Sequence, residues 1–227
     1  MTRVLQPELL DELPADDPRA LHSRRDLRRL NALMGNGRII AKFVRAALRG
    51  RRSAGESLVI AEIGAGEGLI GSFVAKQLRE DGYDGKLLLV DRVTLGNGRI
   101  DGWETRAIQG DVFEWFEQAP RVDVIIANLF LHHFTDKKVK ALLERCAGLC
   151  DCFAAAEPHR SPIGAWFSRR VGLLGCIEIT RHDAEISVRA GFVGDELSNL
   201  WPHSTDWRLT EQRGGLFTHF MGAIRKA

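Results

Sequence analysis

Three glycines and one acid are the residues of this 227-residue sequence best suited to binding a ligand. Gly64, Gly66 and Gly68 follow a short apolar run, and a helical pattern begins directly after them. Glycine adopts positive φ and lets a ligand approach the backbone, although a plain tight turn uses the same residues. Asp91 ends the next apolar run, where a carboxylate can accept hydrogen bonds from ribose hydroxyls. The pattern predicts a nucleoside site.

The glycine spacing bears on the kind of nucleotide. The dinucleotide fingerprint is G-x-G-x-x-G, and its third glycine lets the helix pack on the sheet. Here the spacing is G-x-G-x-G, and Leu69 takes the place of the third fingerprint glycine. The helix start is therefore not well matched to a pyrophosphate, and a dehydrogenase on the same topology is only an alternative.

Histidines are the candidate groups for proton transfer. His132 and His133 follow the fourth apolar run, and His182 lies further along the chain. An imidazole has a pKa near neutrality and can take the proton from a reacting hydroxyl. Each of the three can also be a packing or helix-start residue, so all three are candidate bases.

Four segments in order resemble the motifs of class I methyltransferases that use S-adenosylmethionine (SAM). Residues 62–68, E-I-G-A-G-E-G, resemble motif I, and Asp91 matches the acid that ends the second strand. Residues 110–112, G-D-V, resemble the segment after the third strand. Residues 128–134, N-L-F-L-H-H-F, resemble the motif IV of many small-molecule enzymes. The likeness covers about residues 58–160 and continues through the C-terminal hairpin.

The resemblance implies a cofactor and the residues that contact it. The cofactor would be S-adenosyl-L-methionine, which leaves as S-adenosyl-L-homocysteine (SAH) after methyl transfer. Asp111 would contact the adenine amine. The expected cofactor-binding residues are Glu62, Gly64, Ala65, Gly66, Gly68, Asp91, Arg92, Asp111, Val112, Asn128 and Leu129.

The segment after the fifth apolar run is expected to face the methyl acceptor. In this family such an insert commonly caps the acceptor pocket, and N-terminal helices form the other wall. Its aromatic and aliphatic residues are typical of an apolar small-molecule site, although an ordinary amphipathic helix has the same pattern. Two arginines would pair with an acceptor carboxylate or phenolate, unless they form structural ion pairs. The expected acceptor-binding residues are His133, His159, Arg160, Trp166 and Arg189.

Residues that are absent narrow the chemistry. Leu129-Phe130-Leu131 follows Asn128, so the D/N-P-P-Y/F tetrad of enzymes that methylate base amines is missing. A cysteine for pyrimidine C5 methylation is missing there too. Asn128 and Glu157-Pro158 stand where metal-dependent catechol enzymes carry aspartate and Asp-Asn. We therefore expect metal-independent methylation, at oxygen, of a small aromatic or polyketide-like acceptor, through proximity and a histidine base.

The elements that position these residues alternate between strands and helices. Periodicity predicts strands at residues 58–63, 86–91, 104–108, 122–127 and 151–157, and helices at residues 18–49, 69–80 and 137–149. Gly35-Asn36-Gly37 predicts a bend in the first helical region, and residues 7–18 form a lead-in loop. Gly214-Gly215 separates residues 207–211 from residues 216–225, which indicates a β-hairpin. In the insert, Asp183 is expected to cap a short helix and Gly191 to follow its end.

This alternation indicates an α/β fold with a mostly parallel sheet and helices on both faces. The family resemblance makes it Rossmann-like, with seven strands in the order 3-2-1-4-5-7-6 and an antiparallel last strand. The length favours one domain over residues 1–227. Its parts are an N-terminal helical lid (1–50), a SAM-binding core (56–160), an acceptor-side insert (160–205) and the hairpin (206–227).

Composition bounds the partners and the compartment. A net charge of +2 is too small to favour nucleic acid, although eleven basic residues gather in residues 19–52. That run is either a solvated helix face or a strip that faces RNA or a membrane. Four cysteines in a C-x3-C-x-C pattern plus Cys176 do not match a zinc site, and the first twenty residues carry no signal peptide. We expect free thiols, a cytoplasmic protein without a membrane span, and a monomer or homodimer.

Two other functions fit the same motifs. An RNA-directed methyltransferase would use the basic segment, and its affinity for RNA would fall steeply with salt. A non-catalytic subunit would bind SAM without turning it over. The N-terminal helices are a candidate lid that orders when SAM binds.

Overall fold

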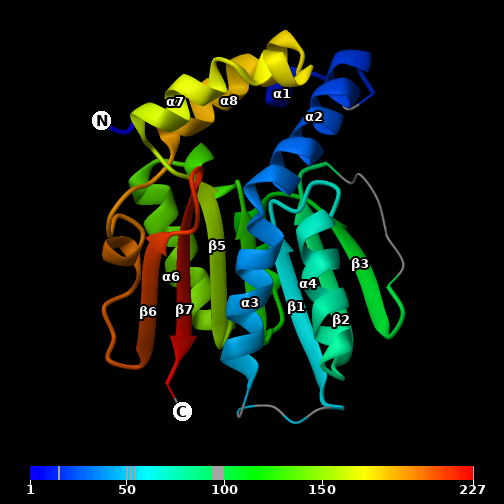
Figure 1. The fold of residues 1–227 in the computed structure, drawn as a ribbon. Coiled ribbons are helices and arrows are strands. Elements are labelled where there is room, and N and C mark those ends of the chain that lie inside the picture. Colours follow the sequence, from blue (N-terminus) through cyan, green and yellow to red (C-terminus); the bar gives the residue numbers. More distant parts are fainter. Residues whose placement is uncertain (15, 50, 52, 54, 94–99, 227) are drawn as a thin grey trace.

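A single seven-stranded sheet forms the centre of the molecule (Figure 1). The computed structural model describes residues 1–14, 16–49, 51, 53, 55–93 and 100–226. The strands are β1 (Ser57–Ile63), β2 (Asp84–Asp91), β3 (Trp103–Gln109), β4 (Val124–Asn128), β5 (Cys152–Pro158), β6 (Trp207–Arg213) and β7 (Thr218–Arg225). Their order is β3-β2-β1-β4-β5-β7-β6, and β7 runs antiparallel to both of its neighbours. The predicted fold class and strand order are confirmed.

Side chains of successive strand residues point to opposite faces, and each face has its own apolar core. On one face, Ile60 and Leu87 pack with α3 (Asn36–Leu48) and α4 (Leu69–Glu80). On the other, Ile63 and Val90 pack with α5 (Val112–Gln118) and α6 (Asp136–Leu149). Burial on both faces explains why the central strands appear in the sequence as continuous apolar runs.

Every predicted strand and helix boundary in the sheet layers lies within two residues of the observed one. The helix α4 was predicted over its observed span, because it starts where Gly68 leaves the loop with φ +68°. The helix α5 was not predicted, since it has only seven residues and too few turns for a clear periodicity.

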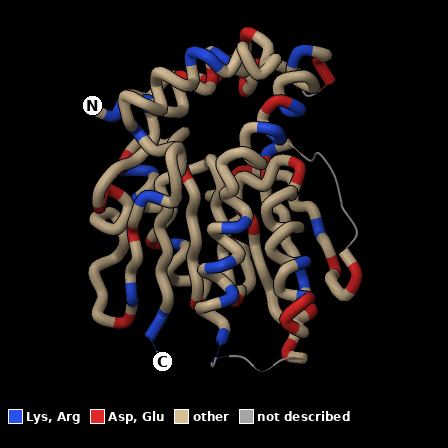
Figure 2. Tube along the Cα trace, in the orientation of Figure 1, with Lys and Arg blue, Asp and Glu red and all other residues tan. Residues whose placement is uncertain are grey.

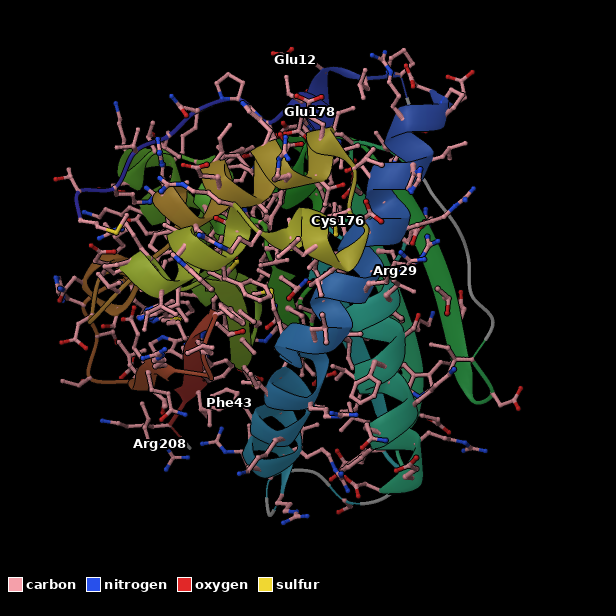
Figure 3. All side chains as sticks on the ribbon, turned by 45° about the horizontal axis from the view of Figure 1, so that its top comes forward. Glu12, Arg29, Phe43, Cys176, Glu178 and Arg208 are labelled. Carbon is pink, nitrogen blue, oxygen red and sulfur yellow. The ribbon has the colours of Figure 1, made fainter. Side chains whose placement is uncertain are left out.

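A layer of helices lies beyond the carboxyl ends of the strands (Figure 1). It consists of α1 (Leu9–Glu12), α2 (Pro18–Met34), α7 (Pro162–Ser168) and α8 (Glu178–Ala190). Short 3-10 turns are η1 (Leu131–His133), η2 (Val171–Leu174) and η3 (Ser198–Leu200). We call this layer of helices the lid. Figure 3 brings the lid forward and shows Cys176, just before α8, near Arg29 of α2. The lid thus joins two parts of the chain that are far apart in sequence.

The predicted N-terminal lid over residues 1–50 differs from this layer. Gly35, with φ +71°, ends α2, and α3 then packs on α4 and the sheet, so α3 belongs to the sheet layer. The segment of residues 160–205 supplies α7 and α8 to the lid in place of α3. The expected bend at residues 35–37 is confirmed, and the expected lead-in loop contains the short helix α1.

The lid helices cap one another, which corrects the role predicted for Asp183. That residue lies inside α8, and its two carboxylate oxygens accept from the amides of Leu9 (2.8 Å) and Leu10 (3.0 Å) at the start of α1. Asp26 of α2 in turn accepts from the amide of Ile177, where α8 begins (2.9 Å). A cap supplied by another element leaves no local spacing for sequence analysis to find.

Gly191 follows α8 as expected, but for a different reason. Its φ is −66°, so the left-handed conformation typical of that position is not used. A Cβ there would lie 2.1 Å from the carbonyl oxygen of Pro158. Glycine is needed because the end of α8 passes directly over the end of β5.

Charges are distributed without an obvious cluster, except along one helix, and three of the four cysteines lie near one another. Figure 2 shows acidic and basic residues interspersed over most of the chain, with basic residues recurring along α3. All four cysteines are free, and burial raises the pKa of Cys152 to about 12. In the part of the chain that the structure describes, no helix is long and apolar enough to cross a bilayer.

Candidate active site

The glycine loop after β1 is shaped by contacts on two sides. Gly64, Gly66 and Gly68 have φ values of +65°, +51° and +68°. A Cβ on Gly64 would lie 2.1 Å from the ring of Phe130, and one on Gly68 would lie 2.5 Å from Leu89. A Cβ on Gly66 would meet nothing within 4 Å. The loop therefore packs closely at both ends and leaves the backbone of Gly66 open to a ligand.

Asp91 fixes this loop from the end of β2. Its Oδ2 accepts from the amide of Gly66 (2.8 Å), and its Oδ1 accepts from the amide of Val93 (2.9 Å). Each carboxylate oxygen offers two lone pairs, so each retains one for a further donor. Because the residue is only half-buried, a ribose diol has access to it.

The segment after β3 meets this loop. The amide of Gly110 donates to the carbonyl of Asp91 (2.9 Å), which brings the next residue to the same edge. Asp111 is exposed and caps α5 by accepting from the amide of Phe113 (2.8 Å). Val112 is buried beneath it, and Arg92 is exposed on the β2 side. One oxygen of Asp111 is left without a capping role.

Glu62 lies behind the glycine loop. Its Oε2 accepts from the amide of Gly71 (2.9 Å), and burial raises the pKa of Glu62 to about 8 against that hydrogen bond. A Cβ on Gly71 would lie 2.6 Å from the same oxygen. Gly71 therefore allows the close helix packing that the dinucleotide fingerprint assigns to its third glycine. We missed this residue because it stands two positions beyond the fingerprint spacing.

The turn after β4 contains a residue with a strained backbone and is held by hydrogen bonds. Leu129 has φ +50°, a left-handed conformation that costs a bulky residue about 1–2 kcal/mol. Its amide donates to the carbonyl of Ala156 (2.9 Å). Asn128 is buried, and its Oδ1 accepts from Nδ2 of Asn36 (2.8 Å). The Oδ1 of Asn36 in turn accepts from the hydroxyl of Thr218 (2.6 Å). This chain of polar groups ties β4 to α3 and β7.

Glu157, at the end of β5, organises the residues that follow. Its Oε1 accepts from the amides of Phe130 (3.0 Å) and Leu131 (2.9 Å). Its Oε2 accepts from the amide of His132 (3.3 Å) and lies 2.8 Å from Nδ1 of the same residue. Burial opposes ionisation, but the histidine and the two amides lower the pKa of Glu157. A lone acid ending an apolar strand beside β4 was the available signal, and we assigned it no role.

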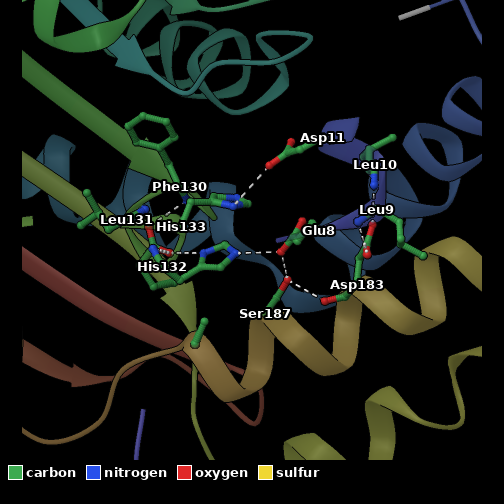
Figure 4. A network of polar contacts seen from close by, with 12 residues as sticks. Glu8, Leu9, Leu10, Asp11, Phe130, Leu131, His132, His133, Asp183 and Ser187 are labelled. Atoms are coloured by element: carbon green, nitrogen blue, oxygen red, sulfur yellow. Dashed lines mark hydrogen bonds and ion pairs between the residues drawn. The ribbon is translucent and has the colours of Figure 1, made fainter. Parts of the chain in front are cut away.

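His132 lies between two carboxylates (Figure 4). Its ring is 3% exposed, and its Nε2 is 3.4 Å from Oε1 of Glu8. Burial alone would lower the pKa of His132, but the hydrogen bonds and charges of Glu157 and Glu8 raise it to about 9. The same interactions, against burial, lower the pKa of Glu8 to about 2. His132 is therefore an imidazolium at neutral pH.

His133 differs from its neighbour in charge. The two rings stack with centroids 4.2 Å apart, and Nδ1 of His133 is 3.7 Å from Oδ2 of Asp11. Burial, and then the positive charge of His132, lower the pKa of His133. Its side chain is 28% exposed. His133 is therefore neutral and accessible where His132 is charged and enclosed.

The N-terminal segment that carries Glu8 and Asp11 is anchored. Arg3 donates to the carbonyls of Phe134 (2.8 Å) and Ala190 (2.8 Å), and its guanidinium lies over the ring of Phe192. Ser187 of α8 donates to Glu8. These contacts join the first residues of the chain to its middle, so no local pattern predicted them.

Glu8, His132 and His133 are also residue types that bind metals. Their candidate ligand atoms lie within 4.8 Å of one another. The proton that the two carboxylates hold on His132 would have to leave before a metal bound there. We had expected no metal from the sequence.

The other candidate residues lie apart from this histidine pair. His182 is half-exposed, and its Nδ1 is 3.1 Å from Asp183. His159 stacks at 6.1 Å on His219, and Trp166 is 56% exposed with the guanidinium of Arg170 over its ring. The structure therefore brings His132 and His133 together, and among the described contacts none joins His182 to them.

The two arginines predicted to bind the acceptor have internal partners. Arg160 is buried and donates to the carbonyls of Met1 (2.9 Å) and Gly191 (2.5 Å) and to the carboxylate of Glu196. Arg189 pairs with Glu185 one turn earlier on α8 (2.5 Å). The structural ion pairs that the sequence left open are present at both positions.

The lid also touches the glycine loop. Arg28 of α2 binds both carboxylate oxygens of Glu67, at 2.6 and 2.7 Å. Glu67 stands between two of the loop glycines. The lid and the nucleoside side of the site are thus in direct contact.

Methyltransferases are among the solved structures that are similar to this chain. The chain matches no known sequence family, and no curated protein matches it. The plantazolicin methyltransferase BpumL in complex with SAH is 14% identical, with a TM-score of 0.65 over 93% of this chain and 92% of that one. An O-methyltransferase family protein from Burkholderia thailandensis is 12% identical, with a TM-score of 0.58 over 94% and 61% of the two chains.

Human N-acetylserotonin methyltransferase in complex with SAM is 16% identical, with a TM-score of 0.54. That match covers 96% of this chain and 61% of the human protein. Identities this low establish the fold alone. Together with the observed strand order and the position of the glycine loop, they show that this chain has the fold of class I SAM-dependent methyltransferases.

Proposed function

We propose that this chain is a SAM-dependent methyltransferase that acts on a small apolar acceptor, at oxygen and without a metal. The observation that carries the proposal is the half-buried carboxylate of Asp91, which holds the open backbone of Gly66 and retains lone pairs for a ribose. Two of the similar solved structures, the plantazolicin methyltransferase BpumL and human N-acetylserotonin methyltransferase, are complexes with SAH and SAM.

The residues around this carboxylate fit a nucleoside cofactor. Gly64, Ala65 and Gly68 keep the loop turned, so that Gly66 faces open space. Asp111 has one carboxylate oxygen available for an adenine amine, above the buried side chain of Val112. Leu129 and Asn128 would form the opposite wall. Bound SAM supplies an electrophilic methyl group on a positively charged sulfur.

We propose His133 as the general base. A base must be neutral to accept a proton, and His133 is the neutral, accessible member of the pair. Its Nε2 would take the acceptor hydroxyl proton as the bond from oxygen to the methyl carbon forms and the carbon–sulfur bond breaks. His132 already carries a proton, so it would position His133 and keep its pKa low. His182 is the less favoured alternative because its described contact is with Asp183.

An apolar acceptor is supported by large side chains that the structure leaves exposed. They are Leu33, Ile163, Trp166, Leu173, Leu174 and Leu216. Their segments, the end of α2, α7 with η2, and the β6–β7 turn, border the carboxyl edge of the sheet (Figure 1). Several exposed apolar side chains on segments that border the same edge are consistent with a binding surface. Trp166, His159 and His133 are the proposed acceptor contacts, in a cytoplasmic monomer or homodimer.

Calorimetric titration with SAM, SAH and NAD tests the cofactor. We expect saturable binding of SAM and SAH, no binding of NAD, and a loss of about 100-fold or more in SAM affinity for Asp91→Ala, since two loop anchors and the ribose contact disappear together. Asp206→Ala is the matched control, because that acid is exposed at the start of β6. Binding of NAD in place of SAM would overturn the proposal. SAM binding without methyl transfer to any of a panel of phenols would favour a non-catalytic subunit.

A further inference from the structure

A basic groove runs along α3, on the side of the sheet that the proposed reaction does not use. It has a volume of about 330 Å³ and lies between α3 and α4. Four cations line it, namely Arg38, Lys42, Arg45 and Arg49. Its apolar lining includes Ala46 and the ring of Phe73.

The four cations form one row. Their spacing of four, three and four residues keeps them on a single helix face. At 1.5 Å per residue, the row is about 16 Å long. Another helix with acids at the same spacing would match the row along its whole length, because it has the same rise.

Three of these cations make no direct ion pair in the described part of the chain, although Arg49 is close enough to Asp81 to help lower the pKa of that carboxyl. Arg45 is bound by Asp81, with carboxylate oxygens at 2.5 and 2.6 Å. Arg38, Lys42 and Arg49 are exposed and form no hydrogen bond or ion pair with any residue that the structure describes. Like charges one turn apart destabilise a helix, so the row has a cost that an acidic partner would remove.

We propose that this groove docks an acidic, amphipathic helix of a partner protein. The carboxylates of that helix would pair with Arg38, Lys42 and Arg49, and an apolar side chain would fill the floor at Ala46 and Phe73. The spacing of the row favours a helix as the occupant, because acids one turn apart on a helix repeat with the same rise. The proposal does not rest on methyl transfer.

Two labelled peptides of about 18 residues test it by fluorescence anisotropy at low salt. The first carries glutamates at the four-three-four spacing with leucines on the adjacent stripe. The second has the same composition with the order scrambled, so that its net charge is equal but its acids point in all directions. We expect the ordered peptide to bind at least about fivefold more tightly, and its affinity to fall as salt rises.

Two triple variants locate the binding surface. R38Q/K42Q/R49Q should weaken binding of the ordered peptide about tenfold, while K137Q/K138Q/K140Q, which removes three exposed cations from α6, should leave it unchanged. Unchanged SAM binding by both variants would show that each is folded. Equal binding of the two peptides, an equal loss in both variants, or tighter binding of a single-stranded RNA of matched charge would overturn the proposal.

Discussion

The ends of β1 and β2 and the ends of β4 and β5 hold their functional groups in different ways. At β1 and β2, the loop is defined by backbone conformation, and one carboxylate, Asp91, binds its amides. At β4 and β5, two histidines depend on Glu157 and on Glu8, which comes from the N-terminal segment. The first region is held by glycine conformations and the second by a network of charged side chains.

This difference shows why the two regions should respond differently to substitution. A loop of backbone groups is disturbed by added volume and is insensitive to most distant changes. A buried charge network is disturbed by the loss of any member, because the remaining charges lose their partners. The expected effects below are ordered from the largest to the smallest.

The largest effect should come from the charge network. Glu157→Gln keeps the shape of the side chain but removes the charge that four donors share, and we expect the free energy of unfolding to fall by about 3–5 kcal/mol. The pKa of His132 should fall as well, because one of its two carboxylates is lost. Chemical denaturation and NMR titration of the histidines measure both quantities.

The comparison requires that this variant leave the cofactor region intact. SAM affinity of folded Glu157→Gln should stay within about threefold of the parent chain. Glu157→Ala, which also removes the acceptor oxygens, should destabilise further. A large loss of SAM affinity without a loss of stability would mean that the two regions are not separate.

The next effect concerns the glycine loop. In Gly66→Ala, the new Cβ meets no protein atom but enters the space proposed for the cofactor. We expect a loss of stability of about 1–2 kcal/mol from the positive φ and a loss of about 100-fold in SAM affinity. Calorimetry and thermal unfolding measure the two effects.

Gly35→Ala is the control for backbone strain. Gly35 has φ +71° and no atom within 4 Å of a built Cβ, but it lies at the α2–α3 bend. The Gly35→Ala variant should lose a similar amount of stability and should keep the SAM affinity of the parent chain. If both variants lost affinity equally, strain would explain the result and open space at Gly66 would not.

Sequence patterns were sufficient for the sheet and for the positions of the glycine loop and Asp91 at its carboxyl edge. Apolar runs fixed the strands because both faces of the sheet are buried, and Gly64, Gly66, Gly68 and Asp91 lie where strand-end logic expects them. These features depend on neighbours in sequence or on adjacent parallel strands. Glu157 also lies near the carboxyl end of a parallel strand, so the same argument from strand ends predicts a role for it.

The acceptor region was predicted only in part. His132 and His133 were identified, but the charged state of one ring and the neutral state of the other depend on burial and on acids such as Glu8 and Glu157, which the sequence does not place near them. Asp183 fits an N-cap pattern and instead caps α1 from inside α8. Arg160 was assigned to the acceptor because a lone arginine has no visible partner in sequence. Tertiary contacts decide all of these roles.

The last effect, the smallest per step of one pH unit, is a pH dependence that separates the two regions. The pKa of His132 is raised from 6.5 to about 9, so its contribution to stability is complete below 6.5 and is lost as pH rises through 9. Glu62 has a pKa raised from 4.5 to about 8, so from 4.5 to 8 only the unfolded chain releases its proton. Both groups make stability fall with rising pH, by at most about 1.4 kcal/mol per pH unit each, but in different windows.

Two variants assign these windows, because each removes one titratable carboxyl group from one region alone. Glutamine does not titrate, so Glu62→Gln should flatten the fall in stability between pH 5 and 8. This change would assign that window to the region of the glycine loop. Glu8→Gln removes one carboxylate from His132, whose pKa then moves back toward 6.5, and this should flatten the fall between pH 7 and 9. Urea denaturation at unit pH steps from 5 to 9 measures both slopes. If Glu8→Gln changed only the acidic window, the proton would not reside on His132, and the assignment of His133 as the neutral base would lose its support.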